Sequence, residues 1–271
     1  MRIHLLILSI LLMAGLSFSA VGQEYHSDGM IQFKKLDKLK WEEVFYDSCS
    51  NDWKEQWTLD GKKATITHSN KGMDFKAGPN YRENASHAVL WTKQSFTGDI
   101  RLEYEYTKLD DVIEAVTILY IQATGSGAEG YDKDISKWAD KREVAAMNLY
   151  FNHMNTYHIS YAAFDIGNKV KGNDYIRARR YIPEKREGLK GTDLIPDYFK
   201  TELFKKDMPH KITIIKKGND LFMRIRNSEK EMLCHWTNER LPPVIEGRIG
   251  LRHMWTRGAR YKDFRVSQLK D

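Results

Sequence analysis

Short runs in which apolar and polar residues alternate make up most of the chain from Trp41 onward. The clearest run is Ile100–Lys108 (IRLEYEYTK), where aliphatic or aromatic residues alternate with charged ones. Side chains on a β-strand point alternately to the two faces of a sheet, so this pattern predicts a strand with one buried face. Gly, Asn and Asp separate the runs, and Asp60-Gly61 and Gly218-Asn219 are typical of hairpin turns.

The pattern predicts twelve or more strands and almost no helix. The expected strands are residues 43–48, 63–69, 86–94, 100–108, 112–123, 147–152, 157–162, 210–217, 221–227, 231–236, 246–254 and 260–269. Residues 112–123 are apolar almost throughout, so we expect them at the centre of a sheet. Residues 125–143 and 183–209 are expected to be loops, the first with one helical turn near residues 135–139. The predicted fold class is all-β, a jelly-roll β-sandwich of two curved antiparallel sheets.

The N-terminus has the pattern of an exported protein. Arg2 and His4 precede an apolar run over residues 5–18, which is followed by the small residues Ser19 and Ala20. This predicts a signal peptide over residues 1–22, a polar, Lys-rich lead-in segment over 23–40 and a single domain over 41–271. The apolar run is too short to favour stable membrane insertion. We therefore expect a periplasmic or secreted protein.

Charge narrows the class of partner. The 271 residues carry a formal net charge of +6, and Arg2 is the only charged residue within the predicted signal peptide, so the mature chain remains basic. A basic exported protein favours an anionic partner such as an acidic polysaccharide or oligosaccharide, while export argues against nucleic acid. The two cysteines, Cys49 and Cys234, could form one disulfide or remain buried thiols, and they lack the spacing of a zinc site.

The stretch Met147–Tyr181 concentrates polar and aromatic side chains. On two predicted strands, one face carries Tyr150 between two asparagines, and then His158 and Ser160 together with Ala162. A predicted loop after these strands ends in Arg177, Arg179 and Arg180. This composition predicts a groove for an anionic, hydroxyl-rich ligand. The alternative is a pair of ordinary half-buried strands with a solvated basic loop.

Several motifs carry a family resemblance. They are His87, Leu90-Trp91-Thr92, Phe96–Ile100, Tyr157–Ala162, Leu251–Met254 and Tyr261–Val266. Through them the chain resembles the YesU-like family of bacterial proteins, known as a domain of unknown function, from about Trp41 to Val266. The resemblance implies a concanavalin A-like jelly roll and a setting in the breakdown of uronate-containing polysaccharides. One hydrolase branch of that fold group carries a Glu-x-Asp-x-x-Glu pattern, from which Glu103-Tyr104-Glu105 followed by Lys108 departs.

The residue types favour a polysaccharide lyase acting by β-elimination. Such an enzyme neutralises the uronate carboxylate, removes the C5 proton and protonates the leaving oxygen. The candidate catalytic residues are His158, His87 and Tyr150, and the candidate substrate-binding residues are Trp91, Gln122, Ser160, Arg177, Arg179, Arg180 and Arg252. We prefer Arg252 to the adjacent His253, because Gly250 on its face would leave room for a ligand.

Two other functions stay open. A glycoside hydrolase would use two of Glu103, Glu105 and Glu114, and a non-catalytic module would bind sugar without turnover. No cofactor is required by any motif. Asp47 and Asp263, in the expected first and last core strands, are candidate ligands for a structural calcium ion.

Overall fold

A computed structural model describes residues 28–164, 174–185 and 187–270. The chain divides into two units, Met1–Leu39 and Lys40–Asp271. The predicted signal peptide lies outside the described residues. In the first unit residues 28–37 are helical, whereas the sequence predicted only a polar lead-in there. Within the described ranges, no helix has the length and apolar character needed to cross a bilayer.

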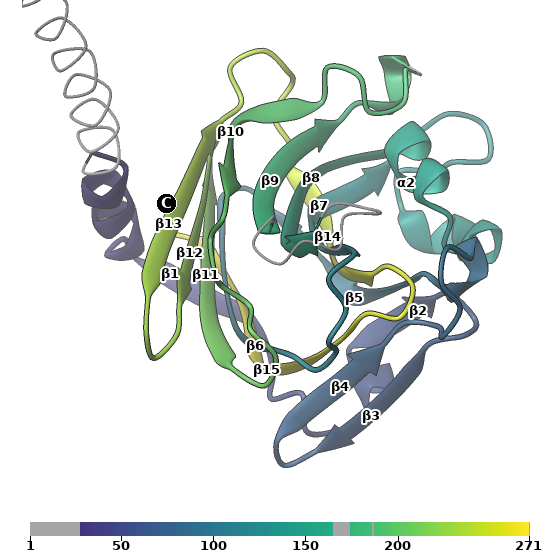
Figure 1. Ribbon diagram of the computed structural model, residues 1–271. Coiled ribbons are helices and arrows are strands. Elements are labelled where there is room, and N and C mark those ends of the chain that lie inside the picture. Colours follow the sequence, from purple (N-terminus) through teal and green to yellow (C-terminus); the bar gives the residue numbers. More distant parts are fainter. Residues whose placement is uncertain (1–27, 165–173, 186, 271) are drawn as a thin grey trace, which may run out of the picture. The chain divides into compact units, whose positions relative to one another are not determined.

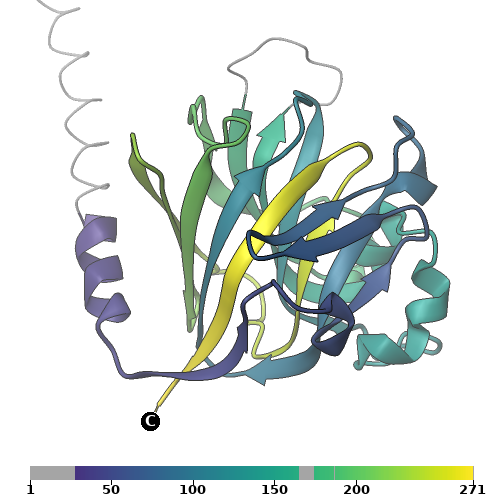
Figure 2. The same ribbon diagram turned by 90° about the horizontal axis from the view of Figure 1, so that it is seen from below.

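The unit Lys40–Asp271 consists of two antiparallel sheets, which confirms the predicted β-sandwich (Figure 1). Sheet A has eight strands among the described residues, in the order β13-β12-β11-β6-β15-β4-β3, with β1 also paired to β15. They are β1 (Trp41–Asp47), β3 (Thr65–Ser69), β4 (Gly72–Lys76), β6 (Ile100–Lys108), β11 (Pro209–Lys217), β12 (Asp220–Arg226), β13 (Glu231–Thr237) and β15 (Gly258–Leu269). The long strand β15 has β6 along one side and β4 and β1 along the other (Figure 2).

Sheet B has seven strands in the described part of the chain, in the order β10-β9-β8-β7-β14-β5-β2. They are β2 (Trp57–Asp60), β5 (Ala88–Thr97), β7 (Ala115–Gly125), β8 (Met154–Phe164), β9 (Asp174–Tyr181), β10 (Asp193–Phe199) and β14 (Glu246–His253). As expected from its apolar sequence, β7 is the central strand of the sheet.

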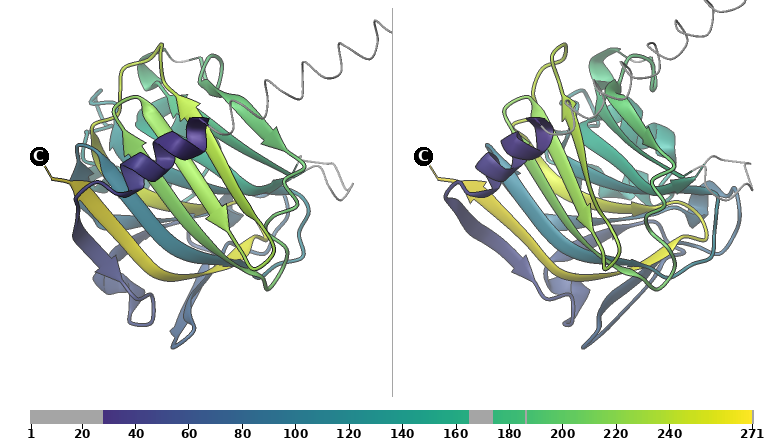
Figure 3. Two further views of the ribbon diagram at one scale, coloured as in Figure 1. Left: turned by 90° about the vertical axis from the view of Figure 1, so that its left-hand side faces the viewer. Right: turned by 60° about the vertical axis from the view of Figure 1, so that its left-hand side comes forward.

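The main core lies between the two sheets, which face each other in Figure 3. The alternation in β6 places Leu102, Tyr104 and Tyr106 in this core, as the sequence predicted. Leu119 on β7 and Ile159 on β8 contribute from sheet B. The strand pattern of the sequence therefore determines which face of each sheet is buried between them.

A second apolar cluster covers the opposite face of sheet B. It includes residues of η3 (Ile135–Arg142) and α2 (Met147–His153), packed on Val89, Ile118 and Tyr120. Residues 147–152 were predicted to be a strand, and this was wrong because a seven-residue helix is too short to show its period. The shorter 3-10 helices are η1 (Trp53–Glu55), η2 (Asn84–Ser86) and η4 (Pro183–Lys185).

Three local predictions need correction. Asp60-Gly61 does not turn a hairpin, because β2 belongs to sheet B and β3 to sheet A. The arginine-rich segment is strand β9 and not a loop, and β10 lies within the predicted loop 183–209. Of the two possibilities that the sequence left open for the cysteines, the second holds, because Cys49 and Cys234 are both buried free thiols.

Candidate functional site

Most of the residues that the sequence singled out lie on one face of sheet B. We call this face, which points away from the core between the sheets, the site face. Strand pairing places Trp91, Gly250, Tyr120, His158 and Arg179 in one row across five strands. The next row contains Val89, Arg252, Ile118, Ser160 and Arg177. Adjacent strands are about 4.8 Å apart, so each row spans about 19 Å.

Arg252 is the charged centre of the site face. Its Nη2 donates hydrogen bonds to Nδ1 of His87 at 2.8 Å and to the carbonyl oxygen of Ala145 at 2.6 Å. Its guanidinium carbon lies 4.5 Å from the ring centroid of Tyr150, which belongs to α2. The His87 ring stacks on Trp255 with centroids 4.9 Å apart. Sequence positions as far apart as 87, 150 and 252 therefore meet at one guanidinium.

Aromatic contacts extend this group to the second histidine. The Tyr120 ring stacks on Tyr150 at 5.7 Å and contacts His158 edge to face at 5.8 Å. Tyr181 lies 6.0 Å from Tyr120 and is hydrogen-bonded to Nδ1 of His158. The resulting Arg252 cluster consists of His87, Tyr120, Tyr150, His158, Tyr181 and Arg252. Each of the six side chains is buried.

Four donor atoms of the Arg252 cluster have no hydrogen-bond partner among the described residues. They are Nε and Nη1 of Arg252, the Tyr120 hydroxyl and Nε2 of His87. Because Nδ1 of His87 accepts from Arg252, Nε2 carries the proton of the neutral ring. A buried donor without an acceptor costs about 1–3 kcal/mol. The cluster thus offers several donors to a ligand rich in acceptor oxygens, such as a carboxylate.

His158 is held as a neutral base. Burial, and then the charges of Arg179 and Arg252, lower its pKa well below the ordinary value. Its Nε2 lies 2.6 Å from the Ser160 hydroxyl, and Nδ1 bonds the Tyr181 hydroxyl. Burial raises the pKa of Tyr181 well above its ordinary value. A neutral imidazole can accept a proton from a bound ligand, and a protonated phenol nearby can donate a proton to another atom of that ligand.

Lowered histidine pKa values extend beyond the site face. Four histidines are buried in the described part of the chain, and burial is the first cause of the lowered pKa at each of them. The pKa falls to about 3 at His87 and His253, to about 4 at His210 and well below its ordinary value at His158. His253 faces the core between the sheets and contacts the Tyr261 hydroxyl at 2.8 Å, so Arg252 and His253 point to opposite faces, as predicted.

Asp60 anchors the helical cover to sheet B, and the sequence reading missed it. Its Oδ2 accepts hydrogen bonds from Nε of Arg142 at 2.6 Å, Nε1 of Trp91 at 2.7 Å and the Tyr150 hydroxyl at 3.0 Å. Burial raises the pKa of the Asp60 carboxyl, against the opposing effects of the Arg142 charge and the three donated bonds. The only sequence signal was an acidic residue before a glycine, which favours a turn equally well.

Trp91 lies on the site face, but its ring occupies the space that we expected Gly250 to leave for a ligand. A Cβ at position 250 would lie 2.5 Å from Cζ3 of Trp91. The ring also stacks on Tyr120, with centroids 5.4 Å apart, and its indole nitrogen bonds Asp60. The expectation about Gly250 was therefore wrong, since the missing side chain makes room for a tryptophan.

The three arginines of β9 do not act as one group. Arg177 and Arg179 lie on the site face opposite Ser160 and His158, where Arg177 pairs with Asp197 and Arg179 with Asp193. Arg180 points to the other side of the strand, and its Nε donates to the carbonyl oxygen of Pro242 at 3.0 Å. Alternation along a strand separates Arg180 from its two neighbours.

Two further expectations fail at β-bulges. Gln122 does not share the surroundings of Tyr120, because its amide nitrogen donates to the carbonyl oxygens of Phe96 at 3.1 Å and Gly98 at 3.0 Å. Ala162, expected beside Ser160, packs in the core between the sheets. Both residues have positive φ angles, 53° and 43°, next to register shifts in their strands. A bulge reverses the alternation on which these predictions depended.

The carboxylates considered for hydrolysis are dispersed. Glu103 and Glu105 alternate with the core residue Tyr104, so they lie on the outer face of sheet A, and Glu103 pairs with Arg101. Glu114 accepts a hydrogen bond from the Tyr81 hydroxyl. None of these three side chains contacts the Arg252 cluster.

The proposed calcium ligands have other partners. Strands β1 and β15 do pair, as expected for the first and last core strands. The carboxylate of Asp47 accepts hydrogen bonds from the Cys49 backbone and the Trp57 indole, both at 2.7 Å, and Asp263 accepts from Tyr46 at 2.8 Å. In the described ranges no group of three or more His, Cys, Asp or Glu side chains could hold a metal ion. Both aspartates thus accept hydrogen bonds from protein groups, and the described residues show no metal site around them.

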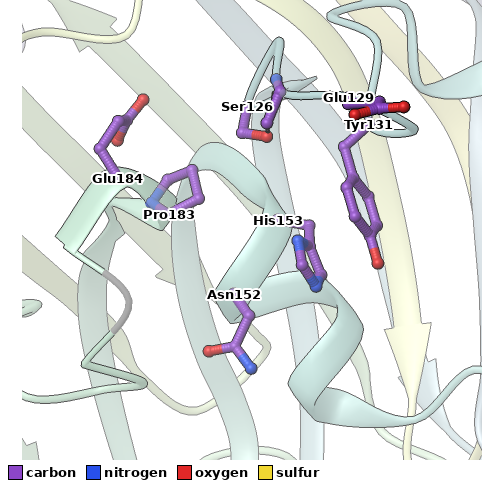
Figure 4. Close-up of a pocket in the computed structure, with 8 residues that line it drawn as sticks. Ser126, Glu129, Tyr131, Asn152, His153, Pro183 and Glu184 are labelled. Atoms are coloured by element: carbon purple, nitrogen blue, oxygen red, sulfur yellow. Dashed lines mark hydrogen bonds between the residues drawn. The ribbon is translucent and has the colours of Figure 1, made fainter.

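An open pocket lies where β7 and β9 end and β8 begins, beside the C-terminal end of α2 (Figure 4). Its volume is about 550 Å³. Glu129 and Tyr131 line it from the loop after β7, Asn152 and His153 from α2, and Glu184 from η4. This volume is within the range of small-molecule sites.

Comparisons with known proteins agree with the fold. A family model described as "Domain of unknown function (DUF1961)" matches residues 44–266, and a search of curated proteins gives no match. The structure is similar to a Bacillus subtilis protein of unknown function with a galectin-like fold, at 18% identity and a TM-score of 0.61, over 84% of this chain and 98% of that one. The exoplasmic/lumenal domain of VIP36 in a Ca²⁺/Man3GlcNAc-bound form matches at 11% identity and a TM-score of 0.53, over 86% and 91%. The carbohydrate recognition domain of Emp46p matches at 10% and 0.52, over 84% and 98%. At these identities the likeness establishes the jelly-roll fold alone.

Proposed function

Because this chain belongs to the DUF1961 family, whose description assigns no activity, we propose a function from the site itself: an exported polysaccharide lyase that acts on an acidic, uronate-containing glycan. The observation that carries the proposal is the buried Arg252 guanidinium, in which two nitrogens have no hydrogen-bond partner among the described residues, in one cluster with the neutral His158. The basic net charge of the chain supports an anionic substrate. The lectin-type relatives of the same fold support a saccharide.

In the proposed reaction, Arg252 binds the uronate carboxylate and stabilises the enolate that develops on it. His158 accepts the C5 proton, the C4–C5 double bond forms and the C4–O4 bond breaks. The Tyr120 hydroxyl, unpartnered among the described residues, donates its proton to the leaving oxygen. Burial raises the pKa of Tyr120, which keeps the phenol protonated.

The structure suggests different roles for two of the predicted catalytic residues. The Tyr150 hydroxyl donates a hydrogen bond to Asp60, and its ring lies against the Arg252 guanidinium. His87 accepts a hydrogen bond from Arg252. We assign both residues to the positioning of the guanidinium. Because α2 and η3 cover the cluster, the glycan reaches it only when a local movement of this cover opens a path to Arg252, while Asp60 continues to hold Tyr150 and Arg142.

The test is turnover of a panel of uronate polysaccharides, followed by the absorbance of the unsaturated product. Tyr120→Phe removes one hydroxyl and keeps the ring contacts with Trp91, Tyr150 and His158, so the fold should persist while turnover falls by roughly 10²–10⁴-fold. Arg252→Met should abolish turnover as well. Arg265→Met is the matched control, because Arg265 is 43% exposed and pairs with Glu43 on sheet A. Wild-type turnover in Tyr120→Phe would refute the assignment of the acid, and saturated reducing ends would indicate hydrolysis.

One observation favours a second candidate, a module that binds the glycan without turnover. Both ring nitrogens of His158 already have hydrogen-bonding partners, Tyr181 and Ser160. A binding module would retain affinity for uronate oligosaccharides, release no unsaturated product and lose that affinity in Arg252→Met.

A further inference from the structure

The pocket beside α2 is chemically unlike the Arg252 cluster. It is open to solvent, whereas the cluster is buried, and its ionisable lining residues include two carboxylates, Glu129 and Glu184, both exposed. Ser126 and Asn152 add a hydroxyl and an amide. Figure 4 shows Ser126 and Glu129 on one side, Glu184 on another and Asn152 across from them. Hydrogen-bonding groups thus surround the space from three segments of the chain.

Two aromatic rings that stack on each other complete the lining. The rings of Tyr131 and His153 stack at 3.6 Å with an interplanar angle of 1°. The Lys141 ammonium lies 4.7 Å from the Tyr131 ring centroid, so a cation adjoins the stack without lining the pocket. Rings beside carboxylate and amide groups match a sugar residue, which has apolar C–H faces and a rim of hydroxyl groups. The carboxylates accept hydrogen bonds from hydroxyls strongly but repel another carboxylate.

The pocket and the Arg252 cluster share α2. Tyr150 faces the cluster, and Asn152 and His153 line the pocket two and three residues later. In a helix this separation corresponds to a rise of about 3–4.5 Å. The same relation holds where β9 ends, since Tyr181 belongs to the cluster and Pro183, at the start of η4, lines the pocket. A single oligosaccharide could therefore reach both places.

We propose that this pocket is a subsite for a neutral sugar residue, and that the glycan carries such a residue next to the uronate. The neighbouring uronate rests on the proposed function, whereas the neutral-sugar site rests on the pocket alone. Oε1 of Glu184 also accepts a hydrogen bond from Nδ2 of Asn155 at 3.2 Å, which positions the Glu184 carboxylate at the rim of the pocket.

The experiment titrates the mature protein with glucose, galactose and mannose, and with glucuronate and galacturonate, by ligand-observed NMR. A neutral sugar should bind, and the uronates should not bind in the pocket. Asn152→Ala and Glu184→Gln should each weaken neutral-sugar binding by roughly tenfold. Glu187→Gln is the control, because Glu187 is exposed and pairs only with Lys190 at 4.0 Å.

Absence of neutral-sugar binding, or binding that survives both pocket substitutions, would overturn the subsite. Those results would leave the lyase proposal to be judged by Arg252→Met and Tyr120→Phe. Conversely, if neutral-sugar binding is lost only in the pocket variants, the subsite is supported even if no unsaturated product is ever released.

Discussion

Removal of the Asp60 carboxylate should test how the cover of sheet B is held. Asp60 and Arg142 form a salt bridge at 2.6 Å, with side chains 3% and 2% exposed. Arg142 belongs to η3 and Asp60 ends β2, so this pair joins the cover to the sheet. Asp60→Ala would leave the guanidinium buried without its anion and would remove the acceptor of Trp91 and Tyr150.

The expected magnitude follows from that burial. Breaking a buried ion pair by removing one partner costs about 3–5 kcal/mol, because the remaining charge is uncompensated. In the double variant, Arg142→Met with Asp60→Ala, both charges are absent. Its loss of unfolding free energy should therefore be smaller than the sum of the two single-variant losses by about 2–3 kcal/mol. Arg142 also donates to the carbonyl oxygens of Ile135 and Trp138. These bonds are lost in Arg142→Met and in the double variant alike, so they cancel in the cycle.

Urea unfolding followed by tryptophan fluorescence measures these free energies, provided that the m-values of the variants agree. Lys137→Ala is the control. It breaks the exposed pair with Asp132, whose side chains are 63% and 46% exposed, and should cost about 0–1 kcal/mol. An Asp60→Ala effect no larger than the control, or strict additivity in the cycle, would contradict the anchoring role.

Three more outcomes are expected. The four buried histidines are neutral in the folded chain, and they protonate below about pH 6.5 once the chain is unfolded. The free energy of unfolding should therefore be greatest above about pH 6.5 and fall towards about pH 3. Urea titrations should show a fall of up to about 1.4 kcal/mol per pH unit for each histidine. A flat profile between pH 6.5 and 4 would refute their burial as neutral groups. Gly250→Ala should lower stability by about 1–3 kcal/mol by displacing the Trp91 ring, with a loss below 0.5 kcal/mol counting against the close contact. Glu103→Gln and Glu105→Gln should each leave turnover unchanged, and a large loss would restore the hydrolase alternative.

Alternation along β6 and β8 was sufficient to predict the β-sandwich and to place His158 and Ser160 on one face and Tyr157 and Ile159 on the other. Period-two patterns are a local property, since neighbouring side chains on a strand must point in opposite directions. The same reasoning failed at Gln122 and Ala162, because a bulge depends on the register of two strands and leaves no clear mark on either.

The sequence by itself determined that this chain folds into stacked antiparallel sheets, and it singled out histidine, tyrosine and arginine as candidate site residues. Only the tertiary structure decided that His87, Tyr150 and Arg252 meet, that Asp60 lies beneath them, and that Arg180 points away. The physical reason is that strand order and helix docking minimise exposed apolar area over the whole domain. Contacts between residues more than 100 positions apart are a consequence of that global minimum, and no local pattern encodes them.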